Sequence, residues 1–138
     1  MKSLLTITLL MLSTVPTWTL ADDVSGARHL LCSVLQSDVC LQDAGCTNVA
    51  PEELNIPRFI RIDARTGKLA TTASSGQNRE TVAASVSRAD GQLILQGVEQ
   101  GRAFSLFIDE ASGDATFTSA ADRLGVAVFA ACTPISEN

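Results

Sequence analysis

Short apolar stretches alternate with turn-forming residues along most of the chain, and this pattern predicts an all-β protein. From about residue 56 onward, turn signals recur roughly every nine to twelve residues, a spacing typical of a sandwich or barrel. Strands are expected at 58–62, 68–74, 81–87, 92–96, 102–108, 115–119 and 125–131. We therefore expect a mainly antiparallel meander of about six to eight short strands, forming a small barrel or a barrel-like sandwich.

Aspartate and glycine mark the turns between these strands. Six turn-forming residues are predicted: Asp63, Gly67, Asp90, Gly91, Asp109 and Gly113. Two of the turns are near copies, in which Ile-Asp precedes a loop that ends in glycine. The aspartate side chain accepts hydrogen bonds from loop amides, and glycine adopts positive φ without steric cost. A calcium site or acid–base pair at Asp63 and Asp109 is the alternative, but neither loop alternates oxygen ligands as a calcium loop does.

The N-terminal third of the chain fits two patterns. Within residues 28–36, alternate residues from Leu30 onward are apolar, which predicts a strand, while Leu31 and Leu35 lie one helical turn apart. Short apolar runs carry this ambiguity. We favour the strand because the rest of the chain is a β meander.

Two short helical turns are also expected. Pro51 stands where a helix is able to start, so one turn is predicted there. Residues 120–123 are a second candidate for a helical turn.

The first 21 residues have the pattern of a secretory signal peptide. A basic start at Lys2 precedes an apolar run of about ten residues, and small residues end the segment at Ala21. That run is too short for a spanning helix, which needs roughly twenty residues. We expect 1–21 to be removed and 22–138 to form a single β-rich domain without a membrane span. The protein is then exported, either to a periplasm or out of the cell.

Four cysteines permit three complete pairings. An oxidising compartment favours disulfides. Cys40 and Cys46 flank a short turn-like segment and are placed to close a small loop, which leaves Cys32 and Cys132 to join the first element to the last. The alternative is a zinc site of His29 with three cysteines, but the paired C-x-x-C spacing of zinc modules is absent.

Charge and aromatic content narrow the range of partners. The chain carries 10 basic and 15 acidic residues, a net charge of −5. An acidic domain repels phosphate backbones, so we expect no nucleic-acid partner, whereas a cationic protein is compatible. The chain has no tyrosine, and its one tryptophan lies in the predicted signal peptide. The five phenylalanines are expected in the core.

No motif for catalysis is present in the sequence. A nucleophile elbow, a phosphate-binding glycine loop and a zinc-protease motif are all missing, so we predict no catalytic, cofactor-binding or metal-ligating residue. Because a closed meander offers a cavity, the leading hypothesis is a non-catalytic binding module for a small apolar ligand or a partner protein. The alternatives are a structural protein of the cell envelope and a hydrolase whose carboxylates meet only on folding.

Several short motifs are spread along the chain: the first three cysteines, the two Ile-Asp turns, and the segments 56–59, 95–97 and 131–134. Their order resembles that in a group of small exported proteobacterial proteins without assigned function. They span most of the chain after residue 21. Because they are turn and cysteine positions, the resemblance implies a fold and implies no activity.

Overall fold

The computed structural model describes residues 22–136, so the predicted signal peptide lies outside the described residues. Within that range the chain forms antiparallel strands and two single-turn 3-10 helices, η1 (Pro51–Leu54) and η2 (Ala73–Ser75). The strands are β1 (His29–Leu41), β2 (Gly45–Asn48), β3 (Phe59–Asp63), β4 (Lys68–Thr71), β5 (Glu80–Val82), β6 (Ser85–Ala89), β7 (Gln92–Glu99), β8 (Arg102–Asp109), β9 (Asp114–Ala121) and β10 (Leu124–Pro134). The predicted all-β fold is confirmed.

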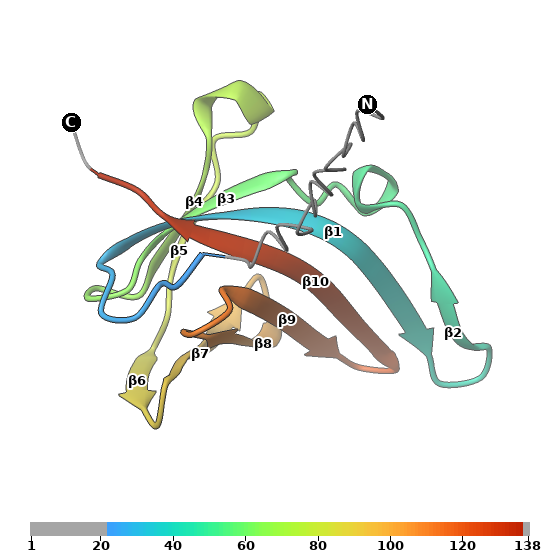
Figure 1. Cartoon of the computed structure of the whole chain (residues 1–138). Helices are drawn as coiled ribbons and strands as arrows, with labels where there is room; N and C mark the ends of the chain where they lie inside the picture. Colours follow the sequence, from blue (N-terminus) through green and yellow to red (C-terminus); the bar gives the residue numbers. More distant parts are fainter. Residues whose placement is uncertain (1–21, 137–138) are drawn as a thin grey trace, which may run out of the picture.

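The strands form one sheet that curls into a half-barrel (Figure 1). Their order is β5-β4-β3-β1-β10-β9-β8-β7-β6, with β2 paired to β1 beside this path. The first and last strands, β1 and β10, therefore lie side by side near the middle of the sheet. Their ladder runs from Leu30 opposite Pro134 to Leu41 opposite Leu124.

The ambiguous N-terminal segment is a strand, as we favoured. β1 pairs with β10 on one side and with β3 on the other, so its inward side chains at Leu30, Cys32 and Val34 are buried. A bulge follows Val34 and leaves Leu35 66% exposed. Strand pairing on both sides thus decides between two patterns that the local sequence allowed.

The single strand expected over 81–87 is divided in two. β5 pairs with β4 and β6 pairs with β7, so the chain crosses from one edge of the curled sheet to the other at Ala83 and Ala84. The amide of Ala83 donates to the carbonyl of Gly67 at 2.8 Å. A Cβ at Gly97 would come within 3.2 Å of the Ala84 nitrogen, so glycine allows this close crossing.

This crossing leaves a gap on one side of the half-barrel. Among residues 22–136 no backbone ladder joins β5 to β7, although both border the same interior. We call this gap the seam, and its two sides are residues 79–82 and 97–99. The seam is the place where side chains, rather than strand pairing, complete the wall.

The helical turn expected at 120–123 is wrong. β9 continues to Ala121 and β10 begins at Leu124, which is directly opposite it in register. The two residues between form a tight hairpin with Arg123 at a φ of 61°. Two-residue hairpin loops need positive φ, so the strand pairing overrides the weak helical preference here.

Side chains alternate between a buried inner face and an open outer face. Phe104 is buried and stacks on Phe117 with ring centroids 5.7 Å apart. Phe59 and Phe129 face outward and are 38% and 41% exposed, so the expectation that every phenylalanine is core was wrong for these two. The reason is that, within the described residues, no second layer covers the outer face.

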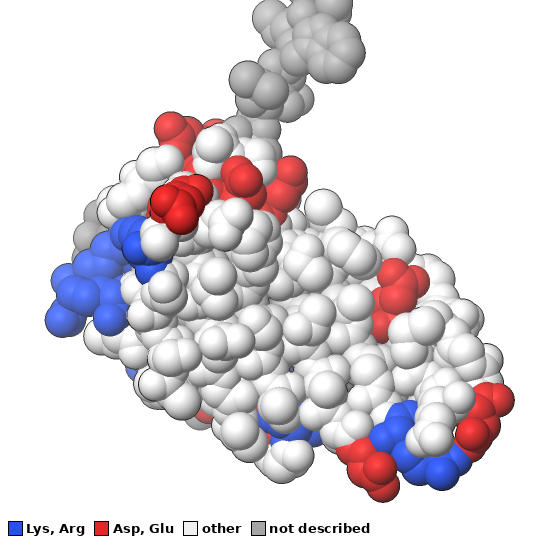
Figure 2. Space-filling model, turned by 90° about the horizontal axis from the view of Figure 1, so that it is seen from below, with Lys and Arg blue, Asp and Glu red and all other residues white. Residues whose placement is uncertain are grey.

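The outer face of the molecule is poor in charge along its middle. Figure 2 shows one side as a broad surface with few charged residues, while acidic and basic side chains gather at its two ends. In register, the outward positions in the middle of β8 and β9 are Ser105, Phe107, Thr116 and Thr118. Within residues 22–136, no helix is long and apolar enough to cross a membrane.

Two disulfides join residues that face each other across strand pairs. Cys32 on β1 bonds Cys132 on β10 across 100 residues of chain, and both are buried. Cys40 bonds Cys46 on the neighbouring strand β2. With all four cysteines bonded, no thiolate is left for the zinc alternative. Two disulfides fit an oxidising environment.

The copied turns have the same geometry in the structure. Asp63 Oδ1 accepts from the second and third following amides at 2.8 and 3.0 Å, and Asp109 Oδ1 does so at 3.1 and 3.0 Å. Gly67 and Gly113 both have a φ of 73°. Asp90 and Gly91 adopt φ values of 55° and 75°, as a two-residue hairpin requires.

Removing the long-range disulfide should destabilise the protein more than removing the short one. In the chain-entropy account, a loop of about 100 residues contributes about 4.7 kcal/mol, and the Cys40–Cys46 loop about 2.4 kcal/mol. We expect the Cys32→Ala/Cys132→Ala protein to unfold at lower urea concentration than the Cys40→Ala/Cys46→Ala protein. Equal losses would show that closing the sheet does not depend on the bond between its first and last strands.

Gly113→Ala should destabilise the fold far more than Gly101→Ala. Both glycines have positive φ, which costs an alanine about 1–2 kcal/mol. A Cβ at Gly113 would lie 2.5 Å from the Cys132 carbonyl oxygen, whereas nothing lies within 4 Å at Gly101. The additional cost at Gly113 should be about 1–3 kcal/mol. Thermal unfolding of both variants measures the difference, and similar melting temperatures would contradict this packing.

Candidate functional site

The inner face of the half-barrel encloses a cavity of about 350 Å³. Inward side chains of β1, β3, β4, β8, β9 and β10 line it, and η1 with the residues after it covers one end. The apolar lining residues are Cys32, Val34, Val39, Leu54, Ile56, Pro57, Ile60, Ile62, Leu69, Ala70, Phe104, Leu106, Ala115, Phe117, Leu124, Val126, Val128 and Ala130. A cavity of this size and lining is typical of small-molecule sites.

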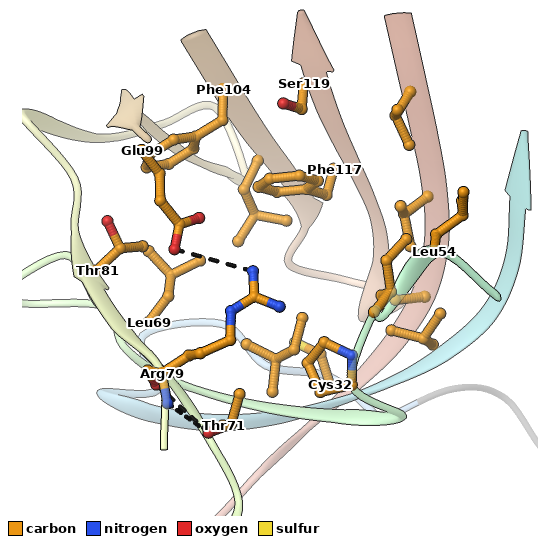
Figure 3. A pocket seen from close by; sticks show the side chains of 18 of the residues that line it. Cys32, Leu54, Leu69, Thr71, Arg79, Thr81, Glu99, Phe104, Phe117 and Ser119 are labelled. Carbon is orange, nitrogen blue, oxygen red and sulfur yellow. Dashed lines mark hydrogen bonds and ion pairs between the residues drawn. The ribbon is translucent and has the colours of Figure 1, made fainter. Parts of the chain in front are cut away.

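Strand alternation is what makes the wall apolar. On β10, Val126, Val128 and Ala130 line the cavity, while the residues between them face outward. Phe104 and Phe117 project from the neighbouring strands β8 and β9 toward the same space (Figure 3). The period of two along each strand therefore places a continuous hydrocarbon surface inside the half-barrel.

Polar side chains meet the cavity at the seam. Arg79 comes from the segment before β5 and Glu99 from the end of β7, and the two side chains point toward each other across the gap (Figure 3). Arg79 Nη2 lies 4.0 Å from Glu99 Oε1, an ion-pair distance too long for a hydrogen bond. The side chains of Arg79 and Glu99 are 42% and 29% exposed.

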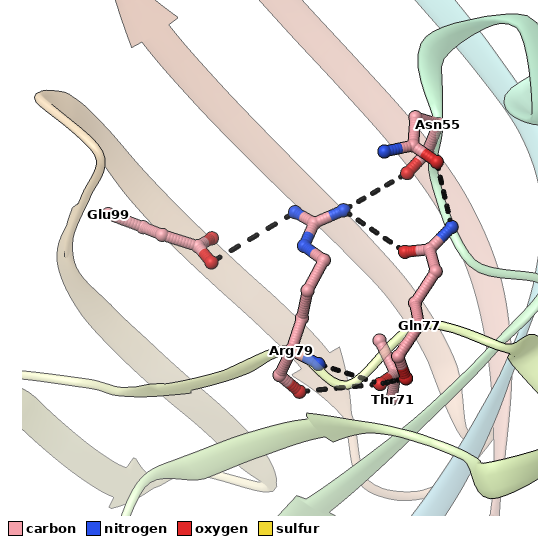
Figure 4. Close-up of polar contacts among 5 residues, drawn as sticks. All are labelled: Asn55, Thr71, Gln77, Arg79 and Glu99. Atoms are coloured by element: carbon pink, nitrogen blue, oxygen red, sulfur yellow. Dashed lines mark hydrogen bonds and ion pairs between the residues drawn. The ribbon is translucent and has the colours of Figure 1, made fainter.

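The guanidinium of Arg79 is held on its other side by hydrogen bonds. Nη1 donates to the carbonyl oxygen of Asn55 at 3.0 Å and to Oε1 of Gln77 at 3.3 Å. Gln77 in turn donates from Nε2 to the Asn55 side chain at 2.9 Å (Figure 4). These contacts fix the direction in which the guanidinium points.

The backbone that carries Arg79 is anchored on β4. Thr71 Oγ1 accepts from the Arg79 amide at 3.1 Å and donates to the Gln77 carbonyl at 2.5 Å. One hydroxyl thus fastens both ends of the segment that holds the arginine (Figure 4). Position and orientation of the guanidinium are therefore both determined by folded structure rather than by a mobile loop tip.

Four charged side chains line the cavity: Arg79, Glu80, Glu99 and Arg102. Glu80 forms an ion pair with Lys68 at 2.6 Å, which compensates its charge. Arg102 lies opposite Glu99 in the β7–β8 register. Among the described residues, Arg79 is the one cationic partner of Glu99 within 4.0 Å.

The residues singled out from the sequence lie mostly outside this cavity. The six predicted turn residues are not among its lining residues, and of the four cysteines only Cys32 contributes to the wall. Within residues 22–136, no three histidine, cysteine, aspartate or glutamate side chains are grouped to hold a metal ion.

Sequence reasoning missed the polar residues of the seam. Gln77 and Arg79 fall between the strands expected at 68–74 and 81–87, and Glu99 falls between those expected at 92–96 and 102–108. Their partner Asn55 lies more than twenty residues away in the chain. The one local signal of this site in the sequence is Arg79, a charged residue just before the strand expected at 81–87.

No protein-family model, no curated protein and no solved structure matches this chain. The resemblance to small exported proteobacterial proteins therefore stays a prediction.

The turn and a neighbouring arginine hold the Asp63 side chain in its charged form. Burial favours its neutral form, but the amides of Thr66 and Arg65 and the Arg28 guanidinium 3.4 Å away outweigh this and lower the pKa of Asp63 to about 2. The negative charge therefore stabilises the turn.

Asp63 should make stability depend on pH in acid. Because the pKa is about 2 in the folded chain and about 3.9 in an unfolded one, the stabilisation is fully present above about pH 4. It is lost as the pH falls toward about 2. Thermal unfolding should show the wild type losing its advantage over Asp63→Asn in that window. A difference in melting temperature that is constant from neutral pH to pH 2 would contradict this role of the charge.

Proposed function

We propose that this is an exported, non-catalytic binding module whose half-barrel cavity takes a small apolar ligand. The observation that carries the proposal is the cavity itself, about 350 Å³ in volume and lined mainly by hydrocarbon. A fully packed interior would leave no such space, since protein cores are close-packed. Burial of an apolar ligand there would be favoured by about 25 cal/mol per Å² of apolar surface removed from water.

The placement of polar groups also supports a binding role. They converge at the seam, at one side of the cavity, which is the arrangement by which small-molecule sites orient a ligand. Of the two carboxylates that line the cavity, Glu80 is engaged by Lys68 and Glu99 faces Arg79. Both are thus placed as partners of cations, which favours binding over carboxylate catalysis.

Export is part of the proposal. Residues 1–21 have the pattern of a signal peptide, and the two disulfides fit an oxidising compartment. A binding module in such a compartment would meet apolar molecules from the cell envelope or the surroundings.

A neutral fluorescent probe tests the cavity directly. We expect N-phenyl-1-naphthylamine to bind the purified protein with enhanced fluorescence, because its rings leave water for hydrocarbon. Ser119→Phe should abolish this binding by filling the cavity that Ser119 lines. Thr118→Phe is the matched control, since Thr118 is exposed on the outer face of the same strand.

The proposal fails if the probe does not bind, or if both phenylalanine variants reduce binding equally. Circular dichroism of each variant checks that the sheet is intact before the titrations are compared.

A further inference from the structure

We infer that the ligand is an anionic amphiphile, whose apolar tail fills the cavity while its carboxylate or phosphate head binds Arg79 at the seam. This inference rests on the proposed function and specifies the chemistry of the ligand. It follows from where the arginine lies, from which of its nitrogens are engaged, and from the balance of charge around it.

Arg79 lies at the border between hydrocarbon and solvent. Its guanidinium points into the space that Phe104, Phe117 and Leu69 bound (Figure 3), yet its side chain is 42% exposed. A molecule with its tail among the phenylalanines would therefore bring its head to the guanidinium. The same border lets a charged head keep part of its hydration, which avoids the full cost of burying a charge.

The engaged nitrogens leave one edge of the guanidinium available. Guanidinium offers five N–H donors, and Nη1 uses its two on Asn55 and Gln77. Among the described residues, Nε and Nη2 donate no hydrogen bond, and the nearest carboxylate oxygen, from Glu99, is 4.0 Å from Nη2. The Nε and Nη2 donors form the planar fork that binds a carboxylate or phosphate through two parallel hydrogen bonds.

The surrounding charge favours an anion over a cation. Arg79 at the seam and Arg102, opposite Glu99 in the β7–β8 register, both line the cavity, and of the described lining acids Glu99 alone has no lysine partner. An anionic head would replace Glu99 as the partner of Arg79 and would add a hydrogen-bonded contact where a loose 4.0 Å pair now exists. Glu99 is thus a competitor, and its removal should strengthen binding of an anion.

Displacement of N-phenyl-1-naphthylamine by four amphiphiles, each with a ten-carbon chain, tests this assignment. We expect decanoate and decyl phosphate to displace the probe at concentrations about tenfold lower than decanol does. The reason is that hydrogen bonds between Arg79 and a charged head are stronger than a hydrogen bond to a neutral hydroxyl. Decyltrimethylammonium should be the weakest. The ratio of decanoate to decyl phosphate affinity shows which anionic head the fork prefers.

Variants of the two facing seam residues are expected to change the affinity for anions in opposite directions. Arg79→Gln should remove most of the preference for the anions, measured as the ratio of decanoate to decanol affinity in the same variant, so that any change in probe affinity cancels. Glu99→Gln should strengthen anion binding several-fold. Arg61→Gln is the matched control, because Arg61 is an exposed arginine that faces outward on β3.

Decanol binding as tightly as decanoate would overturn the inference, as would an anion preference that survives Arg79→Gln. Either result, with the probe still bound, leaves the proposed apolar site standing. Failure of the probe itself to bind would contradict the proposed function, and the inference with it.

Discussion

The pairing of the first strand with the last is the constraint on which the half-barrel depends. β1 and β10 share the longest ladder of the sheet, and the buried Cys32–Cys132 bond joins them at directly opposite positions. Each strand then carries one half of the meander, β3 to β5 on one side and β9 to β6 on the other. Because both halves curl toward the same face, the central pair forms the floor of the cavity between them.

The cavity exists because the sheet does not close by hydrogen bonds alone. The chain crosses from β5, which pairs with β4, to β6, which pairs with β7, through a short bend at Ala83 and Ala84, and among the described residues no ladder joins β5 to β7 at the seam. Side chains complete the wall there, with Arg79 facing Glu99 at a distance that leaves donors unused. Alternation of side chains along the strands makes the interior apolar, and the missing pairing between β5 and β7 places polar side chains at its edge. The fold therefore accounts for both the apolar and the charged part of the proposed ligand.

Much of this fold was predictable from local patterns, and the site was not. Alternation and turn residues such as Asp90 and Gly91 predicted the strands, because hairpins depend on neighbouring residues. The division of 81–87 was not visible, since it depends on Ala83 bonding to Gly67 after the sheet has curled. The seam was missed for the same reason. Arg79 acquires its role from Asn55 and Glu99, which lie about twenty residues away on either side and are brought near it only by folding.

Mapping a bound amphiphile on the folded protein tests the central claim most directly. In a titration of isotope-labelled protein with decanoate, followed by nuclear magnetic resonance, we predict that the methyl groups of Val126 and Val128 shift, together with the ring of Phe117. Signals of Phe59 and Phe129, which face outward, should stay in place. Shifts confined to the outer residues, or an absence of shifts at saturating decanoate, would contradict a ligand site inside the half-barrel.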